Sequence, residues 1–418
     1  MVLFTLVGIL VGILGWLMCL DMTQVGKIAS GVTEHDMFEM RLTLNGIDYE
    51  DFRTGGKDTK HPGNQLKVIS DTEVISFEDV ELKGRGNSTW GAPKSPMQLK
   101  LSEKFDLFGL GAAKKWVLLA NYFDASLSRN DVALKLAAML DEKYVTRGEF
   151  VKLYVDDEYM GVYYLTHKVE ISKGSVDLRD MDGILMEIDS LHWETEDCYF
   201  TAEKTCLVLK GAVTENDETI VKRAVADFVE DYNLLERLAA RHDYAAIADL
   251  VDIKSFAEYY LISEFTSNPD AYTSSFYLYK NGEMDVLHAG PAWDYDLALA
   301  NREWIWGEGD EIYSPYAIMP LREGVMKKEG YGAATKVIYQ MIEIPEFQAE
   351  VKRIFQEKWL GHKNELLSWM RQRRDLIREA ALEDAEKWER EDFDTEMAYL
   401  LDWVERRFDY FEYEFGGE

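Results

Sequence analysis

Cysteine is scarce in this 418-residue sequence, which contains only Cys19, Cys198 and Cys206. No two of them have the close spacing of a zinc site, and no cysteine–histidine pattern suggests one. A structural zinc site is therefore not expected. Cys198 and Cys206 bracket the short segment YFTAEKT, which suits a hairpin, and the sequence leaves open whether these two thiols are bonded.

Basic residues are also in short supply, with 46 lysines and arginines against 77 acidic residues and a formal net charge of −31. Proteins that bind nucleic acid through its backbone usually carry a basic face, so this balance argues against nucleic acid as a partner. A nucleotide is an anion too. A nucleotide site in this chain therefore requires a local cluster of basic residues or a divalent cation.

Proline is rare, with 8 residues, whereas hydrophobic residues make up 47% and aromatic residues 13% of the chain. This composition is typical of a globular protein with a large buried core. The length allows two or three lobes, or one continuous bilobal unit. The 11 tryptophans and abundant acids also leave open a metal-dependent carbohydrate-binding or carbohydrate-processing protein, although aromatic residues more often pack in cores.

Charge is absent from residues 2–20, which read VLFTLVGILVGILGWLMCL. An uncharged run of this length suits a signal-peptide core or a membrane span, and we expect residues 1–21 to form a hydrophobic helix, preferably an uncleaved signal anchor. No basic residue precedes the run, so its orientation does not follow from the sequence. Residues 22–36 read as a polar spacer, and we expect the rest of the chain outside the cytoplasm.

The remaining pattern changes along the chain from strands to helices. Residues 37–101 alternate polar and apolar positions between Gly and Asn turns, as strands do. Residues 126–140 have the pattern of an amphipathic helix, and residues 150–170 read as a hairpin. After about residue 215 helical periodicity predominates, with a strand pair at 274–296. This order predicts an α+β fold with a strand-rich lobe, a helical lobe and a cleft between them.

The first segment with potential chemistry is 83–90, KGRGNSTW, which lies between two predicted strands. Small residues let a backbone approach a phosphate closely, and exposed N–H groups can then bind it. In the following strand MQLKL, Gln98 and Lys100 share one face, so Lys100 projects just after a glycine turn, where a kinase holds phosphates. By itself such a segment is more often a tight turn.

Two later segments carry carboxylates at the ends of predicted elements. Asp270, in Asn-Pro-Asp before a strand, can orient or deprotonate a hydroxyl nucleophile, although an Asx-turn is the simpler interpretation. Asp294 and Asp296, in Trp-Asp-Tyr-Asp after an apolar strand, can bind a divalent cation beside phosphates. The glycine turn, the strand lysine, the first Asp and the second Asp follow one another in the order that protein kinases use.

Six segments in order resemble the CotH family of kinase-like proteins, over about residues 37–412. They are RGNSTW with PK and LKL, WVLLANYFDASLSRNDVALKLA, GVYYLTHKVE, NPDAYTSSFYLYK, GPAWDYD and LLDWVERRFDYF. The resemblance implies an atypical bilobal protein-kinase-like fold, with an N-lobe of about 37–190 and a C-lobe of about 191–412. It also implies transfer of the γ-phosphate of ATP, with Mg²⁺ or Mn²⁺, to serine or threonine of coat or cell-surface proteins.

Carried over by position, the resemblance makes Asp270 the catalytic acid/base, Asp294 a metal ligand and Asp296 a second carboxylate close to the metal. It makes Lys100, or else Lys94, the lysine that holds the phosphates. The turn expected to lie over the phosphates consists of Gly84, Arg85, Gly86, Asn87 and Ser88.

Two positions depart from the family pattern. Ser275 stands five residues after Asp270, where the family usually places an asparagine as a second metal ligand, and serine is a shorter, weaker ligand. His167 stands where an acidic residue is expected, so a carboxylate partner of the phosphate lysine is lost or moves to Glu170. Both changes leave open a catalytically weak or inactive kinase-like scaffold, membrane-anchored or secreted, at the spore coat or cell surface.

Overall fold

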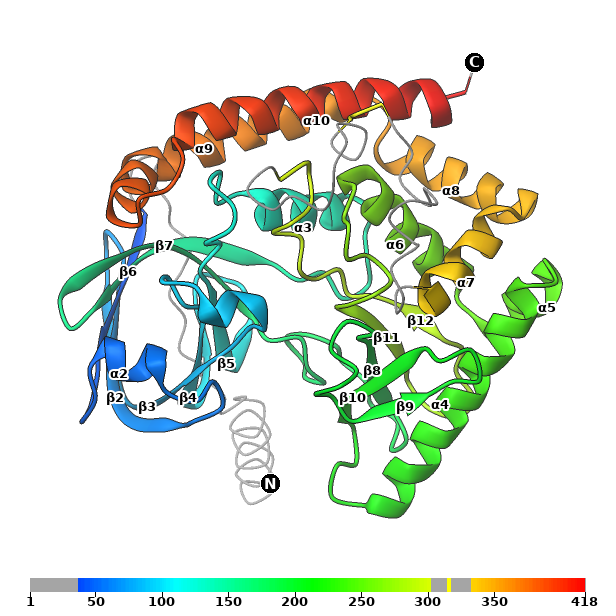
Figure 1. Cartoon of the computed structure of the whole chain (residues 1–418), viewed down its shortest axis with the longest axis horizontal. Coiled ribbons are helices and arrows are strands. Elements are labelled where there is room, and N and C mark those ends of the chain that lie inside the picture. The colour runs from blue at the N-terminus through cyan, green and yellow to red at the C-terminus, as the bar shows by residue number, and fades with distance from the viewer. Residues whose placement is uncertain (1–36, 302–313, 317–331, 418) are drawn as a thin grey trace, which may run out of the picture.

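The computed structural model describes residues 37–301, 314–316 and 332–417. The expected N-terminal helix and spacer lie outside these ranges. None of the helices in the described ranges is long and apolar enough to cross a membrane. Strands β1–β7 gather on one side of the molecule, β8–β12 lie among most of the helices on the other side, and α9 (Lys363–Lys387) and α10 (Phe393–Phe415) run across both (Figure 1).

Seven strands close into a barrel in the order β1-β2-β3-β4-β5-β7-β6. The parallel pair of β1 with β6 closes the barrel, and the other neighbours are antiparallel. The predicted strands of residues 37–101 and the predicted hairpin at 150–170 are confirmed. The strands are β1 (Phe38–Thr43), β2 (His61–Ile69), β3 (Val74–Gly84), β4 (Met97–Asp106), β5 (Ala112–Leu119), β6 (Gly148–Val155) and β7 (Glu158–His167).

The barrel interior is filled by the apolar side chains that alternate along these strands. Leu66, Leu99, Trp116 and Leu165 are completely buried there. Each buried side chain of this size stabilises the fold by roughly 1.5–3 kcal/mol. Below the turn that follows β3, Phe52 of the short helix α2 (Tyr49–Thr54) packs edge-on against Trp90, with ring centroids 5.3 Å apart. The glycine turn is therefore built on a packed aromatic base.

A second, antiparallel sheet has the strand order β12-β11-β8-β10-β9. Its strands are β8 (Ile184–Ile188), β9 (Cys198–Phe200), β10 (Cys206–Ala212), β11 (Phe276–Lys280) and β12 (His288–Ala289). The predicted strand pair at 274–296 is confirmed as β11 and β12. β8 belongs to this sheet, although it precedes residue 190, where the sequence placed the end of the N-lobe.

Helices pack around this sheet. The centre of the bundle is α6 (Ile253–Thr266), in which every residue from Phe256 to Thr266 is buried. Helices predicted near 126–140, 219–238, 244–250 and 253–265 are confirmed. The other helices are α3 (Arg129–Met139), α4 (Glu218–Ala239), α5 (Tyr244–Leu250), α7 (Gly332–Ile342) and α8 (Pro345–Lys358). Some of the acidic residues stabilise the N-termini of these helices. Asp217, Asp243, Asp252 and Asp392 are the N-caps of α4, α5, α6 and α10.

Helix α9 joins the barrel to the helical half. It packs against β7, and its backbone carbonyl at Ala380 accepts a hydrogen bond from Tyr159 Oη at 2.8 Å. Trp388, which ends the helix, donates through Nε1 to the carbonyl of Met160 at 3.0 Å. The mixed α+β class predicted from the sequence is confirmed, whereas the closure of the strands into a barrel was not predicted.

Candidate functional site

A cavity of about 340 Å³ is lined by both the glycine turn of the barrel and the five-stranded sheet. Its wall also includes the loop before α3 and the segments that flank β11 and β12. Of the residues singled out in the sequence, the cavity brings together Gly84, Arg85, Gly86, Asn87, Ser88, Asp270, Ser275, Asp294 and Asp296. Lys94 and Lys100 do not line it.

The glycine turn requires both of its glycines. A β-carbon at Gly84 would lie 2.3 Å from the ring of Trp90, and one at Gly86 would lie 2.1 Å from Thr89 Oγ1. Gly86 also has a φ of 81°, which side chains disfavour. The backbone can therefore fold tightly at this point, and Asn87 is left exposed beyond it.

Asp270 lies in the turn that follows α6. The turn begins at Ser267, whose left-handed φ of 49° ends the helix, and Asn268 Oδ1 accepts a hydrogen bond from the N–H of Asp270 at 3.1 Å. Asp270 Oδ1 is buried and has no hydrogen-bond partner among the described residues. Burial, and then the charge of Asp294, raise the pKa of Asp270 to about 7. A carboxylate with a pKa near neutrality is suited to accept a proton from a hydroxyl group.

Asp294 follows β12 with a φ of 69°, an unfavourable value that its surroundings must impose. Three contacts hold it. Ser275 Oγ donates to Asp294 Oδ2 at 3.0 Å, and Asn268 Nδ2 donates to the Asp294 carbonyl at 3.3 Å. The next residue, Tyr295, donates its backbone N–H to Asn130 Oδ1 of α3 at 2.8 Å. The segment is therefore fixed from α3, from the turn after α6 and from the start of β11.

The carboxyl groups of the cavity oppose one another's ionisation. Burial raises the pKa values of Asp294 and Asp296, and the charges of Asp294 and Asp270 raise that of Asp296 further. Such a cluster is stabilised by a cation. Within the described ranges, no three or more acidic, histidine or cysteine side chains form a complete metal site. Mg²⁺, however, is often bound by one or two carboxylates with phosphates and water completing the shell. The buried carboxyl groups of Asp294 and Asp296, whose pKa values are raised, therefore fit a divalent cation that binds together with phosphates.

Lys94, one of the two lysines predicted to hold phosphates, is instead part of the scaffold. It is completely buried, with Nζ 2.5 Å from Asp384 Oδ2 and 2.6 Å from the carbonyl of Val162. Burial lowers the pKa of Lys94 to about 8. These contacts connect the segment after the glycine turn to β7 and α9, away from the cavity.

Lys100, the preferred lysine, lies on β4 opposite Glu81 of β3 and Lys115 of β5. Gln98, on the same face of β4, does line the cavity. Lys100 is two residues farther from the glycine turn than Gln98, which is about 7 Å along the strand. The wall of the cavity therefore ends before Lys100.

Other basic residues supply positive charge to the cavity. They are Lys57, Lys83, Arg85, Lys168 and Lys210. Lys83 is 3.1 Å from Asp58, and Lys210 forms an ion pair with Glu187 on the neighbouring strand. Lys57 donates to Asn87 Oδ1 at 3.0 Å. These three side chains are thus already engaged by groups of the protein.

Arg85 and Lys168 have no ion-pair partner in the described part of the chain. The Arg85 guanidinium lies 5.1 Å from the centroid of the Trp293 ring, a cation–π distance. Lys168 directly follows β7, and burial followed by the charge of Lys115 lowers its pKa. These two cations are available to an anionic ligand, and the sequence had singled out only Arg85.

His167, where the family pattern led us to expect an acid, lies outside the cavity wall. Its two ring nitrogens are 2.7 Å from the carbonyl of Gly174 and 3.1 Å from that of Gly111. Glu170, the alternative carboxylate, accepts a hydrogen bond from Lys115 at 2.6 Å. Both residues are therefore structural in this arrangement.

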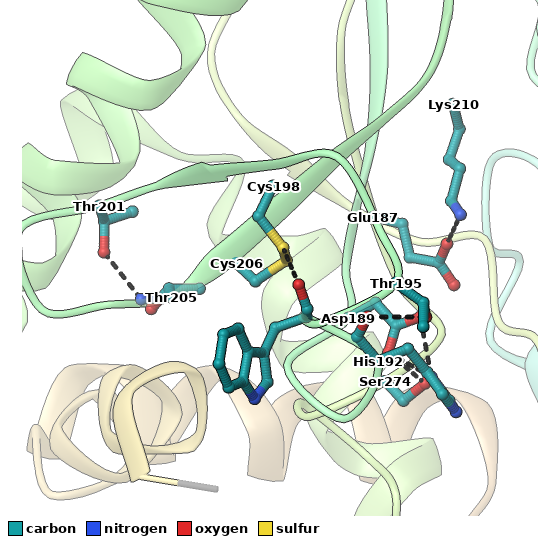
Figure 2. Close-up of a disulfide and its surroundings, with 11 residues drawn as sticks. Glu187, Asp189, His192, Thr195, Cys198, Thr201, Thr205, Cys206, Lys210 and Ser274 are labelled. Atoms are coloured by element: carbon teal, nitrogen blue, oxygen red, sulfur yellow. Dashed lines mark hydrogen bonds and ion pairs between the residues drawn. A yellow bond between two sulfur atoms is a disulfide. The ribbon is translucent and has the colours of Figure 1, made fainter. Parts of the chain in front are cut away.

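Sequence reasoning missed several polar residues of the cavity wall, including Asn130, Asp189 and His192. Asp189 directly follows the buried strand β8, so it carries the same signal, an acid after an apolar strand, that drew attention to Asp294. Close to these residues, Cys198 and Cys206 are bonded and connect β9 with β10 (Figure 2). The question that the sequence left open about these thiols is thereby answered.

Residues 82–411 match the protein family described as CotH kinase protein. No curated protein matches the chain. The matched span includes the glycine turn and Asp270, Asp294 and Asp296.

Proposed function

Because the chain belongs to the CotH kinase protein family, we propose that it is a metal-dependent protein kinase that transfers the γ-phosphate of ATP to serine or threonine residues. The proposed acceptors are coat or cell-surface proteins. The observation that carries the proposal is that one cavity contains the glycine turn together with Asp270, Asp294 and Asp296. In this proposal the barrel acts as the N-lobe of a bilobal kinase, and the helical half acts as the C-lobe.

In the proposed reaction Asp270 accepts the proton of the acceptor hydroxyl. The hydroxyl oxygen forms a bond to the γ-phosphorus, the bond from that phosphorus to the bridging oxygen breaks, and ADP leaves with the electron pair. The proton passes to the carboxylate of Asp270 and from there to solvent. Its buried, unpartnered Oδ1 is an acceptor without a competing hydrogen bond in the described residues, and a positioned base contributes about 10²–10⁴ to the rate.

Asp294 and Asp296 are the residues that would hold a divalent cation, with Ser275 beside them. When bound, such a cation neutralises phosphate charge. Arg85 and Lys168 add positive charge from the barrel side of the cavity. This local supply is what a nucleotide site needs in a chain whose net charge is −31.

The proposed location is outside the cytoplasm, with the N-terminal hydrophobic segment as a membrane anchor or signal peptide. The Cys198–Cys206 disulfide supports it, because disulfides persist in oxidising compartments and are rare in the cytosol.

The test is incubation of the purified full chain, in detergent, with γ-³²P-labelled ATP and Mn²⁺, with the chain itself and dephosphorylated casein as acceptors. We expect label on serine or threonine. A catalytically weak scaffold is the second candidate, because Ser275 replaces a longer amide ligand and its hydroxyl is used in a hydrogen bond to Asp294. A thermal shift with ATP and Mn²⁺ but no labelled product supports the scaffold. If neither a thermal shift nor labelled product is observed, the kinase proposal is wrong.

A further inference from the structure

His192, to which the reaction above assigns no part, lies in the wall of the same cavity. It belongs to the loop between β8 and β9, next to Asp189 and Ser274 (Figure 2). Its Nδ1 is 2.8 Å and 3.0 Å from the two carboxylate oxygens of Asp189. Ser274 Oγ donates to that carboxylate at 3.0 Å. Because the Asp189 side chain is only 4% exposed, these contacts fix the orientation of the imidazole ring.

The far side of the ring is available to a ligand. Nε2 of His192 has no hydrogen-bond partner in the ranges that the structure describes, and the side chain is 29% exposed. Nδ2 of Asn87, in the glycine turn, lies 3.2 Å from Nδ1 of His192. A ring nitrogen that donates to Asp189 cannot also accept from Asn87, so the Asn87 amide retains a donor for a ligand. The Asn87 amide of the glycine turn and the His192 ring of the β8–β9 loop therefore lie side by side in the cavity wall.

The electrostatic surroundings favour the charged form of the ring. The hydrogen bond to Asp189 raises the pKa of His192, and the charges of Asp189 and Asp270 act in the same direction against the effect of burial. In the imidazolium form, Nε2 is a charged N–H donor. Charge-assisted donors of this kind bind phosphate oxygens more strongly than neutral donors do.

The loop that holds His192 is tied down at several points. The carbonyl of His192 accepts hydrogen bonds from the backbone N–H groups of Thr195 and Glu196, at 2.9 Å and 3.1 Å. The disulfide from Cys198 to the completely buried Cys206 then fastens the loop to β10. A donor fixed in advance in this way stabilises developing charge without a reorganisation cost.

We propose that His192 is a catalytic residue of the transfer reaction, whose Nε2–H donates a hydrogen bond to a non-bridging oxygen of the transferred phosphoryl group. Asp189 acts as the positioning residue that holds the ring. No proton leaves the ring in the step, since the hydroxyl proton goes to Asp270 as described above. This inference rests on the proposed kinase function and assigns a contact to the γ-phosphoryl position specifically.

The test compares the affinity of ADP with that of ADP plus beryllium fluoride, which mimics the γ-phosphoryl group, in Mg²⁺ buffer by calorimetry. We expect the full chain to bind the pair more tightly than ADP alone. His192→Gln should reduce this gain by about tenfold to a hundredfold, the range of one charged hydrogen bond, and leave the affinity for ADP within about twofold. Asp189→Asn, which keeps the shape of the side chain, should reduce the gain in the same direction.

A matched control is available at His362, whose Nδ1 lies 2.8 Å from Glu365 three residues away, outside the cavity. His362→Gln should keep the full gain from beryllium fluoride. The melting temperatures of the ligand-free variants check that each is folded.

The outcomes separate this inference from the function on which it rests. If His192→Gln and Asp189→Asn both keep the full gain while the wild type shows it, the His192 assignment is wrong and the kinase proposal stands. If His192→Gln weakens the binding of ADP alone as much as the binding of ADP plus beryllium fluoride, the histidine contacts another part of the nucleotide and the assignment is also wrong. If the wild type binds no nucleotide at all, both the proposed function and this inference fail.

Discussion

The side-chain oxygen of Asn130 accepts a hydrogen bond from the backbone N–H of Tyr295 at 2.8 Å. Because Tyr295 lies between Asp294 and Asp296, this one contact orients the segment that carries both carboxylates. Asn130 is held in turn, since its Nδ2 donates to Asn121 Oδ1 at 3.1 Å. The candidate metal-binding segment is thereby connected to the first turn of α3, over more than 150 residues of sequence.

Asn130→Ala should lower the rate of phosphoryl transfer at least about tenfold, because the Asp294–Asp296 segment loses its support. It should also lower the free energy of unfolding by about 1–3 kcal/mol, since the N–H of Tyr295 is left buried and unpaired. Steady-state kinetics and urea denaturation measure the two effects. Asn233→Ala is the control, because Asn233 accepts from the backbone N–H of Ala202 at 2.7 Å outside the cavity, and it should leave the rate unchanged.

The raised pKa of Asp270 predicts that the difference in stability between the wild type and Asp270→Asn depends on pH. The pKa is about 7 in the folded protein against 3.8 for the free group, so folding favours the protonated form. Its contribution to stability is complete below pH 4 and is lost as the pH rises through 7. Asp270→Asn should therefore be more stable than the wild type at pH 8 without divalent cations, by at most about 4 kcal/mol, and nearly equal to it at pH 4. Urea denaturation at the two pH values measures this, and an Asp270→Asn protein that is less stable at pH 8 contradicts it.

Removal of the lysine charge should destabilise the fold at Lys94 and should have no appreciable effect at Lys100. Lys94→Met leaves Asp384 buried without its lysine partner and should lower the free energy of unfolding by about 3–5 kcal/mol. Lys100→Met should change neither stability nor ATP affinity appreciably, because Lys100 does not line the cavity. Urea denaturation and ATP calorimetry on both variants test the pair, and a selective loss of ATP affinity in Lys100→Met restores the original assignment.

Arg85 and Lys168 are expected to supply the positive charge that ATP meets in the cavity. Arg85→Gln and Lys168→Gln should each weaken ATP binding by about tenfold. This loss of affinity should be smaller at high salt, because salt screens charges that are exposed to solvent. Calorimetry at two ionic strengths measures this, with Lys100→Gln as the matched control. Unchanged affinity in both cavity variants contradicts this role.

Local patterns in the sequence predicted much of what the structure contains. Alternation marked the strands of residues 37–101, and the glycine turn together with Asp270 and Asp294 proved to lie in one cavity. The strands depend on neighbours in sequence, which periodicity and turn residues report well. The closure of the barrel depends on the parallel pairing of β1 with β6, more than 100 residues later, which no local pattern records.

The positions of the basic residues relative to the cavity were not predicted, for a related reason. Lys94 has the same surroundings in sequence as a phosphate-binding lysine, but its partner Asp384 is 290 residues away on α9. The face of Lys100 was deduced from alternation, which does not tell how far along a strand a cavity extends. Lys168 and His192 lie at a strand end and in a loop, where periodicity carries no information about neighbours in space.

The central claim is that Asp270, Asp294 and the glycine turn form one kinase active site. It is tested most directly by the rate of ³²P transfer from γ-labelled ATP in Mn²⁺ buffer, for the wild type, Asp270→Asn and Asp294→Asn. We predict labelled product from the wild type and a loss of at least about a hundredfold in each variant, with the fold retained by melting temperature. Transfer at the wild-type rate in either variant would contradict the account.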